Sequence, residues 1–205
     1  MKRVSKMEHN ILITSIGGQG GIALARVLSQ AALDQGLNVR VGETLGMAQR
    51  GGSVQSHIRI GEDVHGFIIP RGRCDVLLSL EPSESLREPE YLSSGTKIIL
   101  NTTPVYPIPV LLKEASYPEL NKVTSALERI GCTIFRIDAR RLALSVNAPT
   151  SLNIVILGAY TALEEGVLNM ESLRKAMRES LSRKFLDANN RAFEKGCEAM
   201  KKMLS

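Results

Sequence analysis

Apolar positions open the chain as one short block followed by a segment of helical periodicity. The run Ile11–Ile16 is mostly apolar, which is typical of a central parallel strand. Gly21–Gln35 is rich in Ala, Leu, Ile and Val and predicts a helix, with Gly36 at its C-terminal cap. Asn38–Val41 predicts the next strand. Together these segments indicate one βαβ unit.

The pattern then changes to strict alternation. Val54–Ile60 places every second residue on an apolar face, which predicts a half-exposed strand. Gly61-Glu62-Asp63 predicts a turn, and Val64–Ile69 is expected to pair back onto the alternating strand. The sequence therefore predicts one β-hairpin within the sheet.

Further strands and helices follow. Predicted buried strands are Val76–Leu80, Lys97–Leu100 and Thr133–Ile137. Residues 104–118 hold four prolines and predict an ordered surface loop, and the face Leu120, Val123, Leu127 and Ile130 predicts a helix. Beyond Ala139 the pattern predicts helices alone, over 139–147, 151–166, 170–180 and 184–203.

This order predicts one α/β domain over residues 1–205. Its core, 8–138, is expected to be a Rossmann-like, doubly wound, mostly parallel sheet with one β-hairpin, and 139–205 a helical C-terminal region.

Composition narrows the class of protein. The chain has 205 residues, a net charge of +5, four Tyr, four Phe and no Trp. So few aromatic platforms argue against single-stranded nucleic-acid binding. Much of the positive charge falls in residues 171–205, where a solvated helix face explains it more simply than an acidic partner does.

The three cysteines, Cys74, Cys132 and Cys197, lie far apart in the sequence. They cannot supply the four thiolates of an iron–sulfur cluster, so we expect no metal on this chain and a reducing, cytoplasmic setting. The apolar run after the basic N-terminus leads directly into glycines, as a strand does and a signal peptide or membrane span does not.

A glycine turn follows the first predicted strand. Gly17, Gly18, Gln19 and Gly20 approximate a dinucleotide fingerprint whose first glycine is replaced by Ser15. Glu43 follows at the distance expected of a ribose-binding acid. Three interpretations stay open: a nicotinamide or flavin site, a site for another phosphate such as that of coenzyme A, or a turn that only packs the helix on the strand.

A second glycine-rich segment follows the second predicted strand. It contains Gly46, Met47, Gln49, Arg50, Gly51 and Gly52. A guanidinium held between glycines can bind a carboxylate or a phosphate with two parallel hydrogen bonds. The alternative is that Arg50 pairs with a carboxylate within the domain.

Other polar candidates are fewer. The stretch Glu81-Pro82-Ser83-Glu84 follows a buried strand at the same sheet edge. One of its two acids, Glu81 or Glu84, is expected either to face the glycine segments or to cap a helix. Asn153 lies in an apolar helix and needs a partner, from this domain or from another subunit. His9, His57 and His65 show no pairing with a nucleophile and no metal-site spacing, so they are expected to be structural.

Several motifs in order resemble one family. Gly17–Gly20, then Gly46–Val54, then Asp75–Pro82, and finally Asn153–Gly158 and Asn190–Gly196 resemble the gamma-type domain of 2-oxoacid:ferredoxin oxidoreductases over nearly the whole chain. The Met-Ala-Gln-Arg-Gly-Gly-Ser-Val form is most similar to the indolepyruvate type. Ser15 departs from this pattern, where related chains carry glycine.

The resemblance implies a subunit that is inactive alone. A larger alpha chain would carry thiamine diphosphate and the iron–sulfur clusters, and the complex would decarboxylate an aryl 2-oxoacid oxidatively. The products would be an acyl-coenzyme A and electrons for ferredoxin. No membrane or nucleic acid is implied, and the isolated chain is expected to expose apolar surface and to form a homodimer.

Other functions remain open at this stage. The chain could serve pyruvate or 2-oxoglutarate instead of an arylpyruvate, because the first glycine turn is similar in those subunits. It could also be a free-standing dinucleotide-binding domain, as Glu43 would suggest, or a purely architectural subunit whose glycine segments pack a partner.

Overall fold

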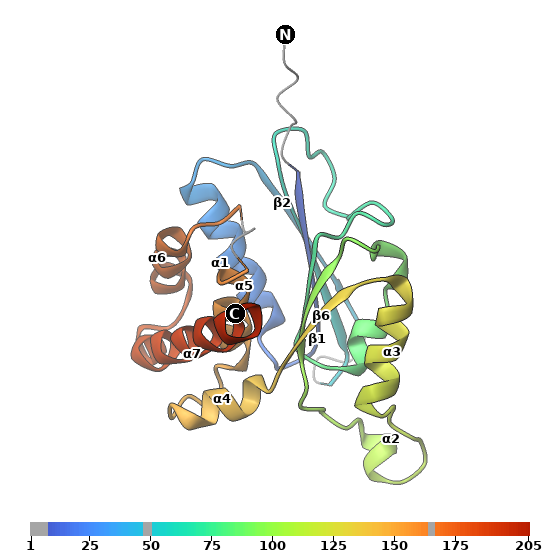
Figure 1. Ribbon diagram of the computed structural model, residues 1–205. Coiled ribbons are helices and arrows are strands. Elements are labelled where there is room, and N and C mark those ends of the chain that lie inside the picture. Colours follow the sequence, from blue (N-terminus) through green and yellow to red (C-terminus); the bar gives the residue numbers. More distant parts are fainter. Residues whose placement is uncertain (1–7, 47–50, 164–166) are drawn as a thin grey trace.

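A computed structural model describes residues 8–46, 51–163 and 167–205, and it contains a six-stranded sheet with helices on both faces (Figure 1). The strand order is β2-β3-β1-β4-β5-β6. The strands are β1 (His9–Ile16), β2 (Val39–Leu45), β3 (Ser53–Ile60), β4 (Val76–Ser79), β5 (Lys97–Asn101) and β6 (Thr133–Ile137). The predicted doubly wound α/β fold is confirmed.

The four strands β1, β4, β5 and β6 pair in parallel, and β3 is antiparallel to both of its neighbours. β3 lies between β1 and β2, so the predicted βαβ unit does not place its two strands side by side. β3 takes the place beside β1 because the two strands pair along their whole length. Ile60 lies opposite His9 at one end, and Ser53 lies opposite Ile16 at the other.

The predicted hairpin partner was wrong. β3 forms its hairpin with the preceding strand β2, whereas Val64–Ile69 is not a strand and crosses the sheet face. Ile69 N donates to Nδ1 of His57 (3.4 Å), and the ring of Phe67 lies directly over Gly42, where a Cβ atom would come within 1.9 Å of it. This segment covers one face of β3, and a helix covers the other face. β3 is therefore almost wholly buried, whereas the sequence predicted a half-exposed strand.

Helices form a layer on each side of the sheet (Figure 1). They are α1 (Gly21–Asp34), α2 (Ile108–Leu111), α3 (Leu120–Ile130), α4 (Ala139–Ser145), α5 (Leu152–Thr161), α6 (Met170–Ser180) and α7 (Leu186–Leu204), with short 3₁₀ helices η1 (Ser83–Leu86), η2 (Pro89–Tyr91) and η3 (Arg183–Phe185). The helix α2 is a single turn inside the segment expected to be a loop.

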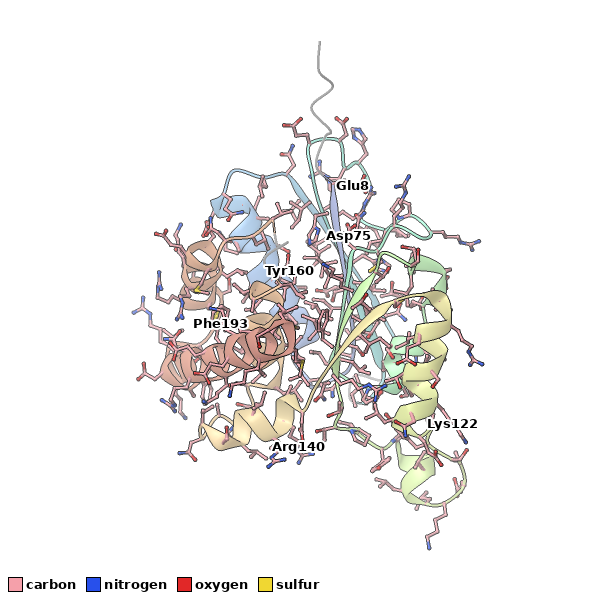
Figure 2. All side chains as sticks on the ribbon, in the orientation of Figure 1. Glu8, Asp75, Lys122, Arg140, Tyr160 and Phe193 are labelled. Carbon is pink, nitrogen blue, oxygen red and sulfur yellow. The ribbon has the colours of Figure 1, made fainter. Side chains whose placement is uncertain are left out.

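Two apolar cores result. The larger lies between the sheet and α1, α5, α6 and α7, and the smaller between the sheet and α3. Tyr160 and Phe193 are fully buried in the larger core, and Figure 2 shows Phe193 among the helices on one side of the sheet. The C-terminal helices therefore complete, together with α1, the layer that covers one sheet face.

No helix among the described residues has the length and apolar character needed to cross a membrane.

Candidate functional site

The two glycine segments meet at the carboxyl end of β1. Gly17 N donates to the carbonyl oxygen of Gly52 (2.8 Å), and Gly51 N donates to that of Gly17 (3.3 Å). The turn after β1 is thus tied by its backbone to the end of the β2–β3 hairpin. Sequence reasoning placed both segments at this sheet edge, and the structure brings them into direct contact.

Left-handed backbone conformations shape the first turn. Gly18 has φ +101° and Gly20 has φ +82°, which side chains rarely tolerate. The side chain of Gln19 spans the turn, because its Oε1 accepts from Ile16 N (3.0 Å) and its Nε2 donates to the carbonyl oxygen of Leu80 (3.1 Å). Gln19 therefore fixes the turn between β1 and β4.

Asn153 contributes a second anchor. Its Nδ2 donates to the carbonyl oxygen of Gly20 (3.1 Å), and its Oδ1 accepts from the N–H of Ile154 (3.0 Å). A Cβ atom on Gly20 would lie 2.5 Å from that amide nitrogen, so the glycine admits the close approach. The partner that a buried Asn153 requires is the glycine turn of the same chain.

Ser15 is accommodated by a neighbouring glycine. A Cβ atom on Gly21 would lie 2.3 Å from Oγ of Ser15, so the hydroxyl occupies the space left by Gly21. That hydroxyl donates to the carbonyl oxygen of Val54 (3.4 Å). The serine that departs from the family pattern thus bridges β1 and β3 beneath the turn.

A hollow of about 370 Å³ opens beside this turn. Its lining combines the glycine turn with the first residues of α1 and with β3, including Ile22, Arg26 and Val54. Gly20 caps α1 without a side-chain hydrogen bond, so the first N–H groups of the helix and the exposed Arg26 guanidinium give the hollow a positive character. Such a surface suits a carboxylate or phosphate.

Glu81 is buried at the same edge but turns away from the glycines. Its Oε2 accepts from Ser83 Oγ (2.6 Å) and from Glu84 N (3.1 Å), which caps η1. Its Oε1 accepts from Val105 N (3.3 Å) and from the hydroxyl of Tyr117. Burial, reinforced by this bond to Glu81, raises the pKa of the Tyr117 phenol. Of the two roles expected for Glu81, the structure therefore supports helix capping.

Glu84, the second acid of the stretch Glu81–Glu84, is the one that contacts the second glycine segment. Its Oε2 accepts from Ser53 Oγ (2.5 Å) at the start of β3, and its Oε1 accepts from Arg87 Nε (2.8 Å). Gln55, two residues further along β3, donates to Glu88 (2.5 Å). The acid-rich stretch after Glu81 was the available signal, and the bonds hold the base of the hairpin against η1.

Other candidates lie apart or outside the described residues. Glu43 is exposed on β2, which is separated from β1 by β3, so it lies about 10 Å from the strand that carries the glycine turn. Met47, Gln49 and Arg50 lie outside the described residues, between Gly46 and Gly51.

His9, His57 and the three cysteines are buried and make contacts within the fold. His9 is the first residue of β1, and its Nε2 bonds to the Tyr160 hydroxyl (3.2 Å). His57 packs edge-on against Tyr91 (4.9 Å between ring centroids), and burial lowers its pKa. Cys74, Cys132 and Cys197 are buried free thiols whose pKa values are raised by burial. Among the described residues, no group of three His, Cys, Asp or Glu side chains could hold a metal ion.

Known proteins match this chain along most of its length. The family model "Pyruvate ferredoxin/flavodoxin oxidoreductase" matches residues 10–199. The indolepyruvate oxidoreductase subunit IorB of Thermococcus kodakarensis is 41% identical over 198 residues, covering 96% of this chain and 98% of the relative. The 2-oxoglutarate synthase subunit KorC of Methanocaldococcus jannaschii is 26% identical, covering 98% of this chain and 99% of the relative.

A solved structure agrees with the fold. The keto/oxoacid ferredoxin oxidoreductase gamma subunit of Geobacter sulfurreducens superposes with a TM-score of 0.69 at 24% identity, covering 95% of this chain and 99% of that one. With both glycine segments, the intervening β3 and the C-terminal helices inside the matched range, this chain belongs to the pyruvate ferredoxin/flavodoxin oxidoreductase family.

Proposed function

We propose that this chain is the small subunit of an indolepyruvate oxidoreductase, a complex that oxidatively decarboxylates aryl 2-oxoacids. The observation that carries the proposal is the contrast in identity: 41% to an indolepyruvate subunit against 26% to a 2-oxoglutarate subunit, each over nearly the full chain. We therefore assign to this chain the substrate class of the relative with the higher identity.

In the proposed complex a larger alpha chain holds thiamine diphosphate and the iron–sulfur clusters. Coenzyme A accepts the acyl group, and electrons pass to ferredoxin. Three buried thiols with raised pKa values are poor ligands for a cluster, which supports placing the redox centres on the partner. Free buried thiols also support a reducing cytoplasm as the compartment.

The proposed contribution of this chain is the carboxyl edge of its sheet. The turn Gly17–Gly20 and the segment Gly46–Gly52 face the reaction site on the partner, with Arg50 directed at a carboxylate or phosphate. Asn153 and Gln19 position the first turn, and Glu81 positions η1 beside it. The whole chain acts as one domain, in which residues 139–205 support the sheet from one side.

A nucleotide-binding domain acting alone fits the geometry less well. The ribose-binding acid of a dinucleotide fold follows a strand adjacent to the glycine turn. Here β3 occupies that place, and Glu43 lies one strand further out.

The test is to co-express the chain with its larger partner under anaerobic conditions and to measure acceptor reduction with indolepyruvate, pyruvate and 2-oxoglutarate in turn. We expect reduction that depends on coenzyme A and is highest with indolepyruvate. Preference for either small 2-oxoacid would contradict the substrate class. Equal activity of the larger chain alone would contradict the subunit role.

A further inference from the structure

One edge of the sheet is open in the described part of the chain. β2 has β3 as its one strand neighbour there, and five of its seven residues are exposed. Val41 is 39% and Leu45 is 58% exposed, on the same face of the strand. Natural edge strands are commonly protected by charged side chains, above all Lys, by Pro or by a bulge. β2 carries no Lys or Pro, and its two exposed charges, Arg40 and Glu43, are of opposite sign.

The hydrogen bonds to β3 identify which backbone groups of β2 point outward. Gly46 N donates to Ser53 O (2.9 Å), and Gly61 N donates to Asn38 O (3.0 Å). Both pairs belong to the register in which Arg40 faces Arg59, so the even-numbered residues exchange bonds with β3. The N–H and C=O groups of Val39, Val41, Glu43 and Leu45 therefore point away from the sheet.

We propose that β2 pairs antiparallel with β2 of a second copy of this chain, centred on Gly42, and so joins the two sheets into one. Antiparallel pairing of identical strands is two-fold symmetric, so both copies use the same surface. In this register all seven residues of each strand are paired, and Val39 faces Leu45 of the copy. The four outward-facing residues of each strand then supply about eight inter-chain hydrogen bonds.

Charge and shape select this register. Shifting the copy so that Glu43 faces Glu43 of the copy brings two carboxylates together, which destabilises a cross-strand pair. Shifting it the other way leaves two residues of each strand unpaired. With Gly42 on the axis, no side chain competes with Phe67, which lies over this glycine and is 41% exposed. The Phe67 rings of the two copies then cover the centre of the interface.

Two substitutions at one position test the pairing. Val41 faces Glu43 of the copy, so Val41→Glu places two carboxylates opposite each other and Val41→Lys places an ammonium opposite a carboxylate. Both variants lose the same apolar side chain at position 41. We expect light scattering on the full chain to give twice the 22.4 kDa chain mass for wild type and for Val41→Lys. For Val41→Glu we expect a dimer dissociation constant at least about tenfold higher.

A cross-link gives a second measurement. Arg40 faces Thr44 of the copy in a pair that exchanges no hydrogen bonds, where side chains come closest. The double variant Arg40→Cys with Thr44→Cys should therefore form an inter-chain disulfide on mild oxidation. Within one strand these positions are too far apart to bridge, about 13 Å. The matched control is Leu33→Ser on the exposed face of α1, which should leave the dimer unchanged.

Three results would overturn the proposal. The first is a monomeric wild type at micromolar concentration, the second an equal effect of the Lys and Glu substitutions, and the third the absence of the disulfide-linked dimer. If the larger subunit covers β2 instead, Val41→Glu will release that subunit while the wild-type small chain alone stays monomeric.

Discussion

At the scale of single residues, the amide of Asn153 is the contact that joins α5 to the glycine turn. Replacing Asn153 with Leu removes one of the two donors to the Gly20 carbonyl oxygen, which still accepts from Leu24 N (3.0 Å). Because one hydrogen bond is lost and the oxygen stays bonded, we expect a loss of about 0.5–1.5 kcal/mol in the free energy of unfolding. Urea denaturation measures this loss, and a stability equal to wild type would contradict the anchoring role.

The isosteric Asn153→Asp variant separates anchoring from packing. It keeps the shape but replaces the Nδ2 donor with an acceptor, so it should destabilise the chain at neutral pH and recover in part when the carboxyl is protonated. As a control, Asn190→Asp on α7 changes the same side chain away from the turn and should be near neutral.

His57 makes the stability depend on pH. Burial lowers the pKa of this imidazole, so the folded chain resists protonation. Below about pH 6.5 the unfolded chain binds a proton that the folded chain does not, and stability falls as pH falls, by at most about 1.4 kcal/mol per pH unit for one group.

We expect His57→Gln to reduce this acid slope, measured from urea midpoints at several pH values between about 7.5 and 5. Leu33→Ser on the exposed face of α1 gives the control, because it removes no titratable group and should retain the wild-type slope. An unchanged slope in His57→Gln would assign the acid sensitivity to another group.

At the scale of elements, two glycines allow α5 and α7 to pack at backbone contact. A Cβ atom on Gly158 would lie 2.0 Å from the Phe193 carbonyl oxygen, and one on Gly196 would lie 1.9 Å from that of Val155. Backbone atoms of packed helices cannot move aside as a flexible side chain can. The close crossing therefore requires glycine at both positions.

Gly196→Ala should destabilise the chain by about 1–3 kcal/mol or more, although alanine favours an isolated helix. The thermal midpoint measures the effect, and Lys202→Ala on the exposed side of α7 is the matched control. A gain in stability would mean that the two helices do not meet as closely as the structure shows.

Local pattern was sufficient for most elements but not for the pairing of β3. The apolar run of β1, the helix α1 with Gly36 after it and the C-terminal helices were all predictable from periodicity and caps. The partners of β3 depend on contacts between segments about 40 residues apart, and alternation along one strand carries no information about them. For the same reason the sequence placed an acid of the stretch Glu81–Glu84 near the glycine segments but did not identify Glu84 as the one that bonds to Ser53.

At the scale of the whole molecule, the anchoring contacts are spread over several segments and meet at one sheet edge. Gln19 bonds to the end of β4, Asn153 joins α5 to Gly20, and Glu84 holds the base of the hairpin. Figure 2 places Arg140, which follows β6, at the end of the molecule opposite Glu8 and Asp75. Among the described residues no group of three His, Cys, Asp or Glu side chains could hold a metal ion, and a rigid edge of this kind is what we propose the chain offers to the reaction site of its partner.

Arg50 is the residue through which that edge is proposed to act. Its loop begins at Gly46, bonded to Ser53, and ends at Gly51, bonded to Gly17, so both ends of the loop are fixed. If the guanidinium binds a carboxylate or phosphate, Arg50→Ala should remove a charge-assisted interaction of about 1.5–3 kcal/mol. That corresponds to a loss of about ten- to a hundredfold in kcat/KM of the complex for indolepyruvate.

Arg50→Lys keeps the charge but not the two parallel hydrogen bonds, so it should restore only part of the activity. Arg178→Ala, on the exposed side of α6, should have wild-type kinetics. The thermal midpoint of the Arg50→Ala chain and its co-purification with the larger subunit must both stay at wild-type values. Full activity with normal assembly would remove Arg50 from the mechanism, and failed assembly would make the loop a docking element with no direct part in turnover.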